Sequence, residues 1–191
     1  MSNTVRFTLV LTLACAAAAG GVGGIYLLTE EPIAQKALET ERAARTKVLP
    51  QAKTFERVGD TPVYAGRDEN GSTVGHVAVG EARGYGGKLT VMVGLMRDGT
   101  IAEAAVLTHH ETPGLGAECA KEVSDDTFWS MCAGNASGVK HSWMDQLRGK
   151  RKDDLKIGAG VDARTGCTIT SKAIVEAAGT AVKKIEDAKK D

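Results

Sequence analysis

The 191-residue sequence lacks an excess of charge of either sign, because 24 lysines and arginines balance 24 aspartates and glutamates. A chain without a basic field does not neutralise nucleic-acid phosphates, so we expect no nucleic-acid partner. Aromatic side chains are scarce, at 4% of residues, whereas glycines number 23. This composition predicts a turn-rich domain with close backbone approaches, in which a bound planar ligand could supply part of the core.

Ionised side chains are absent from the run between Phe7 and Leu28. At about 1.5 Å per helical residue, such a run spans the roughly 30 Å hydrocarbon layer of a membrane, so we expect one N-terminal transmembrane helix. Arg6 precedes the run, and Glu30 and Glu31 follow it. Because positive charge tends to stay on the cytoplasmic side, this arrangement places the rest of the chain outside the cytoplasm.

Two other interpretations of the N-terminus stay open. The segment from Cys15 to Gly21 contains an Ala-x-Ala pattern typical of a cleaved signal peptide. Apolar character resumes at Ile25–Leu28, beyond that cut, which favours a retained anchor. Lipid attachment at Cys15 is disfavoured by Thr12, which stands where such signals usually carry leucine.

The remaining sequence divides into a stalk and one domain. We expect a membrane anchor over residues 1–30, a helical stalk or linker over 31–58 and a ligand-binding domain over 59–191. Short β-type runs separated by turn residues predict an antiparallel sheet, and apolar residues at helical spacing predict a closing helix. The fold class is therefore α+β, a curved antiparallel sheet with packed helices. The expected strands cover residues 62–65, 74–79, 89–96 and 101–108, and the expected helix covers 171–184.

Two segments have residues suited to binding a ligand. His110–Gly116 contains Thr-Pro-Gly-Leu-Gly, whose glycines let backbone lie flat against a planar ligand, although an ordinary turn has the same composition. Asp162–Ser171 brings four hydroxyl side chains to the start of a helix, where free N–H groups and the helix dipole favour a phosphate. Helix capping by serine or threonine is the alternative, and capping needs only one hydroxyl.

Four motifs follow one another along the chain. They are Gly84-Tyr85-Gly86-Gly87, Glu111-Thr112-Pro113-Gly114-Leu115-Gly116, Trp143-Met144-Asp145-Gln146-Leu147, and Asp162 with Thr165-Gly166-Cys167-Thr168-Ile169-Thr170-Ser171. Together, in this order, they resemble the FMN-binding domain family. Within that family, the short single-span form resembles the G subunits of Rnf ion-translocating ferredoxin:NAD oxidoreductases, with the C subunit of the sodium-pumping quinone reductase as close kin. The resemblance covers nearly the whole chain.

The resemblance implies a site for covalent FMN. It assigns phosphoester attachment to Thr168, made by a dedicated exported flavin transferase that reads the acidic residue Asp162. Cys167 stands where the family usually has alanine, and Thr165 where serine is commonest, but the hydroxyl to be modified is retained. The resemblance further assigns Glu111, Thr112, Leu115 and Gly116 to the flavin ring, and Thr165 and Gly166 to the phosphate.

The implied function is electron relay by a membrane-anchored flavoprotein subunit, with no turnover by this chain alone. Its expected partners are the other Rnf subunits, the flavin transferase during maturation, and the membrane. Its expected location is the bacterial inner membrane, with the domain on the periplasmic side. Glu111 is the candidate for tuning the flavin potential. The alternatives are a subunit of another flavin-linked respiratory complex, such as the sodium-pumping quinone reductase, and a non-redox exported binding module.

The cysteines after the second motif raise a separate question. Cys119 and Cys132 could form a disulfide in an oxidising compartment, worth about 3 kcal/mol in the chain-entropy model, or could stay free thiols. A metal site from these cysteines with His109 and His110 matches no zinc spacing, so we expect no metal.

Overall fold

The computed structural model describes residues 3–124 and 140–190. The chain divides into two compact units, Met1–Arg42 and Ala43–Asp191. Helix α1, Asn3–Val48, runs through the whole first unit and is long and apolar enough to cross a membrane. None of the side chains in its most apolar stretch is buried by protein.

Threonine hydroxyls inside the apolar part of α1 are hydrogen-bonded within the helix. Thr8 Oγ1 donates to the carbonyl of Thr4 at 3.0 Å, and Thr12 Oγ1 donates to that of Thr8 at 2.9 Å. Because a polar group without a partner is costly in hydrocarbon, these internal bonds suit the segment to a bilayer.

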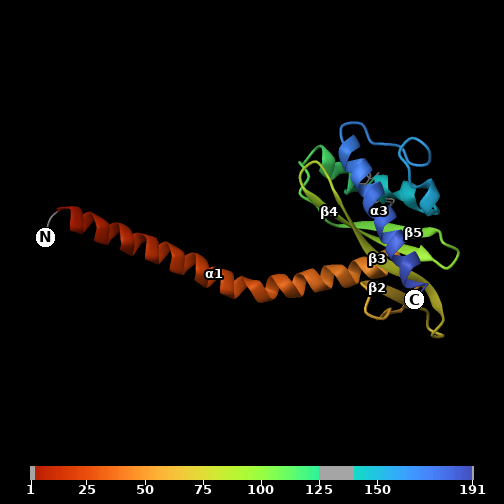
Figure 1. Cartoon of the computed structure of the whole chain (residues 1–191), viewed down its shortest axis with the longest axis horizontal. Coiled ribbons are helices and arrows are strands. Elements are labelled where there is room, and N and C mark those ends of the chain that lie inside the picture. The colour runs from red at the N-terminus through yellow and green to blue at the C-terminus, as the bar shows by residue number, and fades with distance from the viewer. Residues whose placement is uncertain (1–2, 125–139, 191) are drawn as a thin grey trace, which may run out of the picture. The chain divides into compact units, whose positions relative to one another are not determined.

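The second unit contains a five-stranded sheet in the order β1-β2-β3-β4-β5, in which every neighbouring pair is antiparallel. Figure 1 shows helix α3, Thr168–Ala188, lying across this sheet. The expected α+β class is confirmed. The strands are β1 Thr54–Arg57, β2 Val63–Arg67, β3 Thr73–Arg83, β4 Lys88–Met96 and β5 Ile101–Thr108.

One face of the sheet packs against α3. Alternate residues of β4, including Leu89, Val91 and Val93, form a core cluster with apolar residues of α3, including Ile174. Gly80 of β3 faces the helix so closely that a Cβ there would overlap the carbonyl group of Ala177. The glycine therefore lets helix and sheet backbones meet without an intervening side chain.

The opposite face of the sheet packs against the chain that follows residue 43. Val48 and Leu49 are fully buried and form a second cluster with Val77 and Met92. Gly94 of β4 is the close approach on this side, since a Cβ there would overlap the carbonyl of Val48. The sheet is thus covered on both faces, and glycines allow a tight fit on each.

Short elements fill the connection from β5 to α3. Strands β6 and β7 form a two-stranded sheet. Among the described residues of this connection, the 3₁₀ helix η1 precedes β6, and the 3₁₀ helices η2 and η3 follow β7. Their bounds are η1 Gly116–Cys119, β6 Glu122–Ser124, β7 Lys140–Ser142, η2 Trp143–Leu147 and η3 Lys152–Asp154. Helix α3 begins three residues before the expected start at Ser171, so Thr168 is its first residue.

Candidate functional site

The first two motifs lie at the same end of the sheet. The turn Gly84–Gly87 joins β3 to β4, where Arg83 pairs with Lys88. Thr90, near the start of β4, pairs with Thr108 at the end of β5. Because these strands are antiparallel, the turn and the segment after β5 are neighbours in space although they are far apart in sequence.

Glu111 connects three segments at this end of the sheet. Its side chain is buried, with 7% exposed. Oε1 accepts a hydrogen bond from the N–H of Gly86 at 3.2 Å, and Oε2 accepts one from Thr170 Oγ1 at 2.9 Å. One carboxylate therefore joins the β3–β4 turn to the first turn of α3 from a position after β5.

Glycines make room for this carboxylate. A Cβ at Gly84 would overlap Glu111 Oε1, and a Cβ at Gly116 would overlap both Glu111 Oε2 and Thr170 Oγ1. A Cβ at Gly86 would overlap the carbonyl of His110. These glycines of the first two motifs thus serve close packing around Glu111 and its neighbour.

A cavity of about 360 Å³ opens where these segments meet the start of α3. This volume falls within the range typical of small-molecule sites. The cavity is lined by Tyr85, Glu111, Thr112, Leu115, Gly116, Gly166, Cys167, Thr168, Ile169 and Thr170.

Most residues that the resemblance assigned to the flavin ring and its phosphate line this one cavity. Thr165, assigned to the phosphate, and Asp162, assigned to recognition by the transferase, do not line it. Thr165 lies in the preceding turn, and Asp162 lies further back in the same loop, with both side chains exposed.

The start of α3 has no side-chain cap. Cys167 is the N-cap residue, and its side chain makes no hydrogen bond to the first turn. The nearby hydroxyls are used elsewhere: Thr170 donates to Glu111, and Ser171 Oγ donates to the carbonyl of Cys167 at 3.0 Å. Capping therefore does not account for these hydroxyls, and the helix start next to Thr168 has N–H groups suited to a phosphate.

Large apolar side chains are exposed beside the cavity. In the described part of the second unit, Tyr85, Leu115 and Ile169 are the exposed large hydrophobic residues, at 74%, 53% and 55%. All three line the cavity. Three exposed apolar side chains gathered at one cavity make it the candidate binding site.

These features fit FMN. The exposed apolar side chains suit a flat aromatic ring, and the uncapped helix start suits a phosphate. Thr168, whose side chain is exposed at the cavity, offers a hydroxyl between the two.

The loop before Thr168 is tethered at several points. Arg164 donates from its guanidinium to the carbonyl of Glu118 at 3.0 Å, and its own N–H donates to Ser171 Oγ at 3.2 Å. Trp143 and Gln146 each hydrogen-bond the backbone of Asp162. The third sequence motif therefore contacts this loop and not the cavity.

Cys119, the last residue of η1, has a buried side chain close to the first turn of α3. Its Sγ is 3.4 Å from Ser171 Oγ. Burial, followed by the neighbouring Cys167 thiol, raises the pKa of Cys119 to about 12. Cys132 lies outside the described residues, so the pairing of these cysteines stays a prediction, and no cluster suited to a metal occurs within residues 3–124 and 140–190.

Four cavity residues were not among the site residues expected from the sequence. These residues are Tyr85, Cys167, Ile169 and Thr170, and all belong to the motifs. Of the four, only Thr170 was given a role by the sequence, as one of the hydroxyls at the helix start that favour a phosphate. An exposed aromatic residue between glycines was the available signal for Tyr85. The bond from Thr170 to Glu111 joins residues 59 positions apart and has no local signature.

Comparison with known proteins identifies a family for this chain. The model of the FMN-binding domain matches residues 84–183. The G subunit of the Na(+)-translocating ferredoxin:NAD(+) oxidoreductase complex of Acetobacterium woodii is 32% identical over 88% of this chain and 85% of its own length. The proton-translocating counterpart of Clostridium ljungdahlii is 25% identical over 92% and 88%.

Two further similarities complete the comparison. The G subunit of the ion-translocating oxidoreductase complex of Escherichia coli K12 is 28% identical over 93% of this chain and 89% of its own length. The crystal structure of Shewanella oneidensis NqrC is 17% identical, covers 75% of this chain and 74% of its own, and superposes with a TM-score of 0.47. Because the model of the FMN-binding domain matches more than half of its length, the chain belongs to the FMN-binding domain family.

Proposed function

We propose that this chain is the G subunit of an Rnf-type ion-translocating ferredoxin:NAD oxidoreductase, and that it relays electrons through FMN joined to Thr168 by a phosphoester. The observation that carries this proposal is the position of Thr168, exposed at the first residue of α3 and lining the 360 Å³ cavity. Relatives with this name match along most of their length.

Attachment requires an activated donor, because a free phosphate monoester has no good leaving group. The donor is a flavin dinucleotide presented by a flavin transferase. Thr168 Oγ forms a bond to the phosphorus of the FMN half, the phosphoanhydride bond breaks, and AMP leaves. The hydroxyl proton passes to a base of the transferase. Positioning Thr168 at an uncapped helix start supports this step, since the N–H groups and dipole favour the phosphate.

When bound, FMN supplies electron transfer in single steps. Tyr85, Leu115 and Ile169 line the cavity and would cover the ring, limiting the access of water to it. Thr112 and Gly116 would border the ring, and Gly166, with Thr165 in the preceding turn, would lie on the phosphate side. Glu111 joins the walls of the cavity through its hydrogen bonds to Gly86 and Thr170 and would tune the potential of the flavin.

A covalent link suits a subunit that works outside the cytoplasm, because a carrier lost from that compartment is not recovered. The membrane anchor and the charges of Arg6, Glu30 and Glu31 support a single-pass protein of the bacterial inner membrane with its domain on the periplasmic side. Electrons then pass between this domain and other redox subunits of the complex, so the chain has no turnover alone.

The test is expression of the full chain with and without a flavin transferase, followed by denaturing electrophoresis and ultraviolet fluorescence of the gel. The wild type is expected to fluoresce only when the transferase is present, and Thr168→Val is expected to be dark. Thr180→Val is the matched control, because it removes a hydroxyl from the same helix, one that donates to the carbonyl of Glu176 and does not line the cavity. A dark wild-type band would overturn the proposal and favour a non-redox binding module.

A further inference from the structure

The motif Trp143–Leu147 does not line the cavity, yet it has a well-defined local structure. It forms the 3₁₀ helix η2, which opens with a capping box. The N–H of Met144 donates to Ser142 Oγ at 3.3 Å, and the N–H of Ser142 donates to Asp145 Oδ2 at 2.7 Å. Met144 and Leu147 are buried, so the helix is fixed to the core and its outward residues have a defined position.

Two of these outward residues, Trp143 and Gln146, form hydrogen bonds to one residue of another loop, Asp162. In a 3₁₀ helix side chains three positions apart lie on the same face, and Trp143 and Gln146 have this spacing. Trp143 Nε1 donates to the carbonyl of Asp162 at 2.8 Å, and Gln146 Oε1 accepts from the N–H of Asp162 at 2.9 Å. Both backbone polar groups of Asp162 are thus held by side chains, while its carboxylate stays exposed.

This contact fixes one end of the loop that carries the attachment residue. Arg164, two residues on, is fixed separately by the carbonyl of Glu118, and Thr168 is fixed by α3. The loop therefore has a set geometry between its exposed acidic residue and its hydroxyl. Asp162 lies in no helix or strand, and its own backbone N–H and carbonyl are held by these two side-chain bonds.

We propose that Trp143 and Gln146 are positioning residues for flavin transfer, holding Asp162 in the conformation that the transferase reads while Thr168 enters its active site. This inference rests on the proposed function. A preformed loop binds an enzyme without the entropic cost of ordering it. The bonds therefore act on recognition of the chain by the transferase, and the attached flavin does not depend on them.

The experiment uses full-length chain produced without transferase and solubilised in detergent. Purified flavin transferase and flavin dinucleotide are added, and in-gel fluorescence is followed over time at several chain concentrations. Gln146→Leu removes the acceptor, and Gln146→Glu keeps an acceptor oxygen at the same reach. Trp143→Phe removes the N–H donor together with part of the ring that packs against the core. Because one hydrogen bond is worth about 1 kcal/mol, we expect Gln146→Leu and Trp143→Phe each to lower kcat/KM about fivefold, through KM, with labelling still complete at long times.

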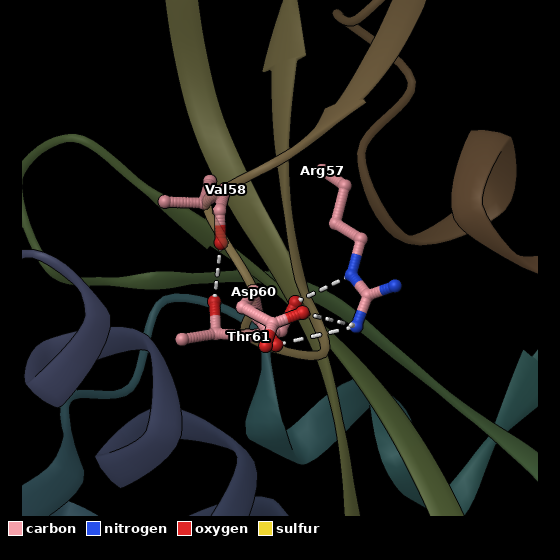
Figure 2. Close-up of polar contacts among 4 residues, drawn as sticks. All are labelled: Arg57, Val58, Asp60 and Thr61. Carbon is pink, nitrogen blue, oxygen red and sulfur yellow. Dashed lines mark hydrogen bonds and ion pairs between the residues drawn. The ribbon is translucent and has the colours of Figure 1, made fainter.

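The turn between β1 and β2 offers a matched control. Figure 2 shows the same kind of contact there: Thr61 Oγ1 donates to the carbonyl of Val58 at 2.6 Å, and Arg57 Nε donates to that of Thr61 at 3.0 Å. This turn contributes no residue to the cavity. Thr61→Val should therefore be labelled at the wild-type rate.

The outcomes separate this inference from the proposed function. Equal kcat/KM for wild type, Gln146→Leu and Trp143→Phe would overturn the positioning role, and so would a Gln146→Glu variant as slow as Gln146→Leu. Thermal unfolding of each variant shows whether the substitution lowers the stability of the whole domain. If it does, the comparison of Gln146→Leu with Gln146→Glu, which change the same residue, still tests the positioning role. An unlabelled wild type would instead contradict the proposed function.

Discussion

Glu111→Ala is the substitution whose effect on stability follows most directly from the structure. The change removes a buried carboxylate that accepts from Gly86 N–H and Thr170 Oγ1, leaving both donors without a partner. Hydrogen bonds to a charged group contribute about 1.5 to 3 kcal/mol each, so we expect the free energy of unfolding to fall by about 3 to 6 kcal/mol. For a chain of this size that corresponds to a fall in Tm of roughly 6 to 24 °C.

Glu111→Gln is the control for this prediction. Its amide oxygen can accept from Gly86, and its amide nitrogen can donate to the Thr170 hydroxyl, which is able to accept. We therefore expect a loss of only about 1 kcal/mol, from the missing charge. Thr170→Val removes the partner, and combining it with Glu111→Ala should cost at least about 1 kcal/mol less than the sum of the single changes.

The assay is thermal unfolding of the full chain in detergent, without flavin, followed by tryptophan fluorescence. Trp143 packs against the core of the domain, so its fluorescence reports on the unfolding of the domain. A Tm for Glu111→Ala within about 2 °C of the wild type, or a Glu111→Gln variant as unstable as Glu111→Ala, would refute the bridging role of this carboxylate.

Three further predictions concern packing, thiol chemistry and ligand coverage. Gly80→Ala should lower the free energy of unfolding by about 1 to 3 kcal/mol, because the added Cβ would overlap Ala177. Gly179→Ala, where the added Cβ meets open space, should raise the free energy of unfolding by about 0.5 to 1 kcal/mol. Equal melting curves for the two variants would contradict this packing. The Cys119 thiol, with its pKa raised from 9.0 to about 12, should carry about a thousandfold less thiolate at pH 8 than an ordinary thiol and resist alkylation in the folded chain, as peptide mapping by mass spectrometry can check; rapid native modification of Cys119 would show that it is not buried. Cys167→Ala should leave flavin attachment intact or improve it, and loss of in-gel fluorescence in that variant would mean that the attachment site is misassigned.

The sheet was predictable from sequence because its signals are local. The expected strands over residues 89–96 and 101–108 correspond to β4 and β5, and Gly99 between them adopts a φ of 83° that its Asp-Gly turn signal anticipates. Strand β1 was missed, since its four residues, Thr54–Arg57, are mostly exposed and show no apolar alternation. Its place in the sheet depends on pairing with β2, which no local pattern encodes.

The candidate site was predictable in its members more than in their contacts. The motifs identified which segments meet. The glycines of Thr-Pro-Gly-Leu-Gly were expected to face a ligand, but at Gly116 the space where a Cβ would lie is taken by Glu111 and Thr170. The start of α3 was placed too late, because Ser171 looks like a cap, whereas its hydroxyl bonds back to Cys167 within the helix. Such assignments require the tertiary arrangement, since each depends on a partner many residues away or on a competing hydrogen bond.

The scarcity of aromatic residues and the exposure of Tyr85, Leu115 and Ile169 are two aspects of one arrangement. Elsewhere in the domain, glycine and alanine bring backbones into direct contact, as at Gly80 and Gly94, so few large side chains are needed to fill the core. At the cavity the backbones do not meet in this way, and apolar side chains are exposed around a space of about 360 Å³. A planar ring bound there would bury these side chains, so the cofactor would contribute to the packing of the domain as well as carry electrons.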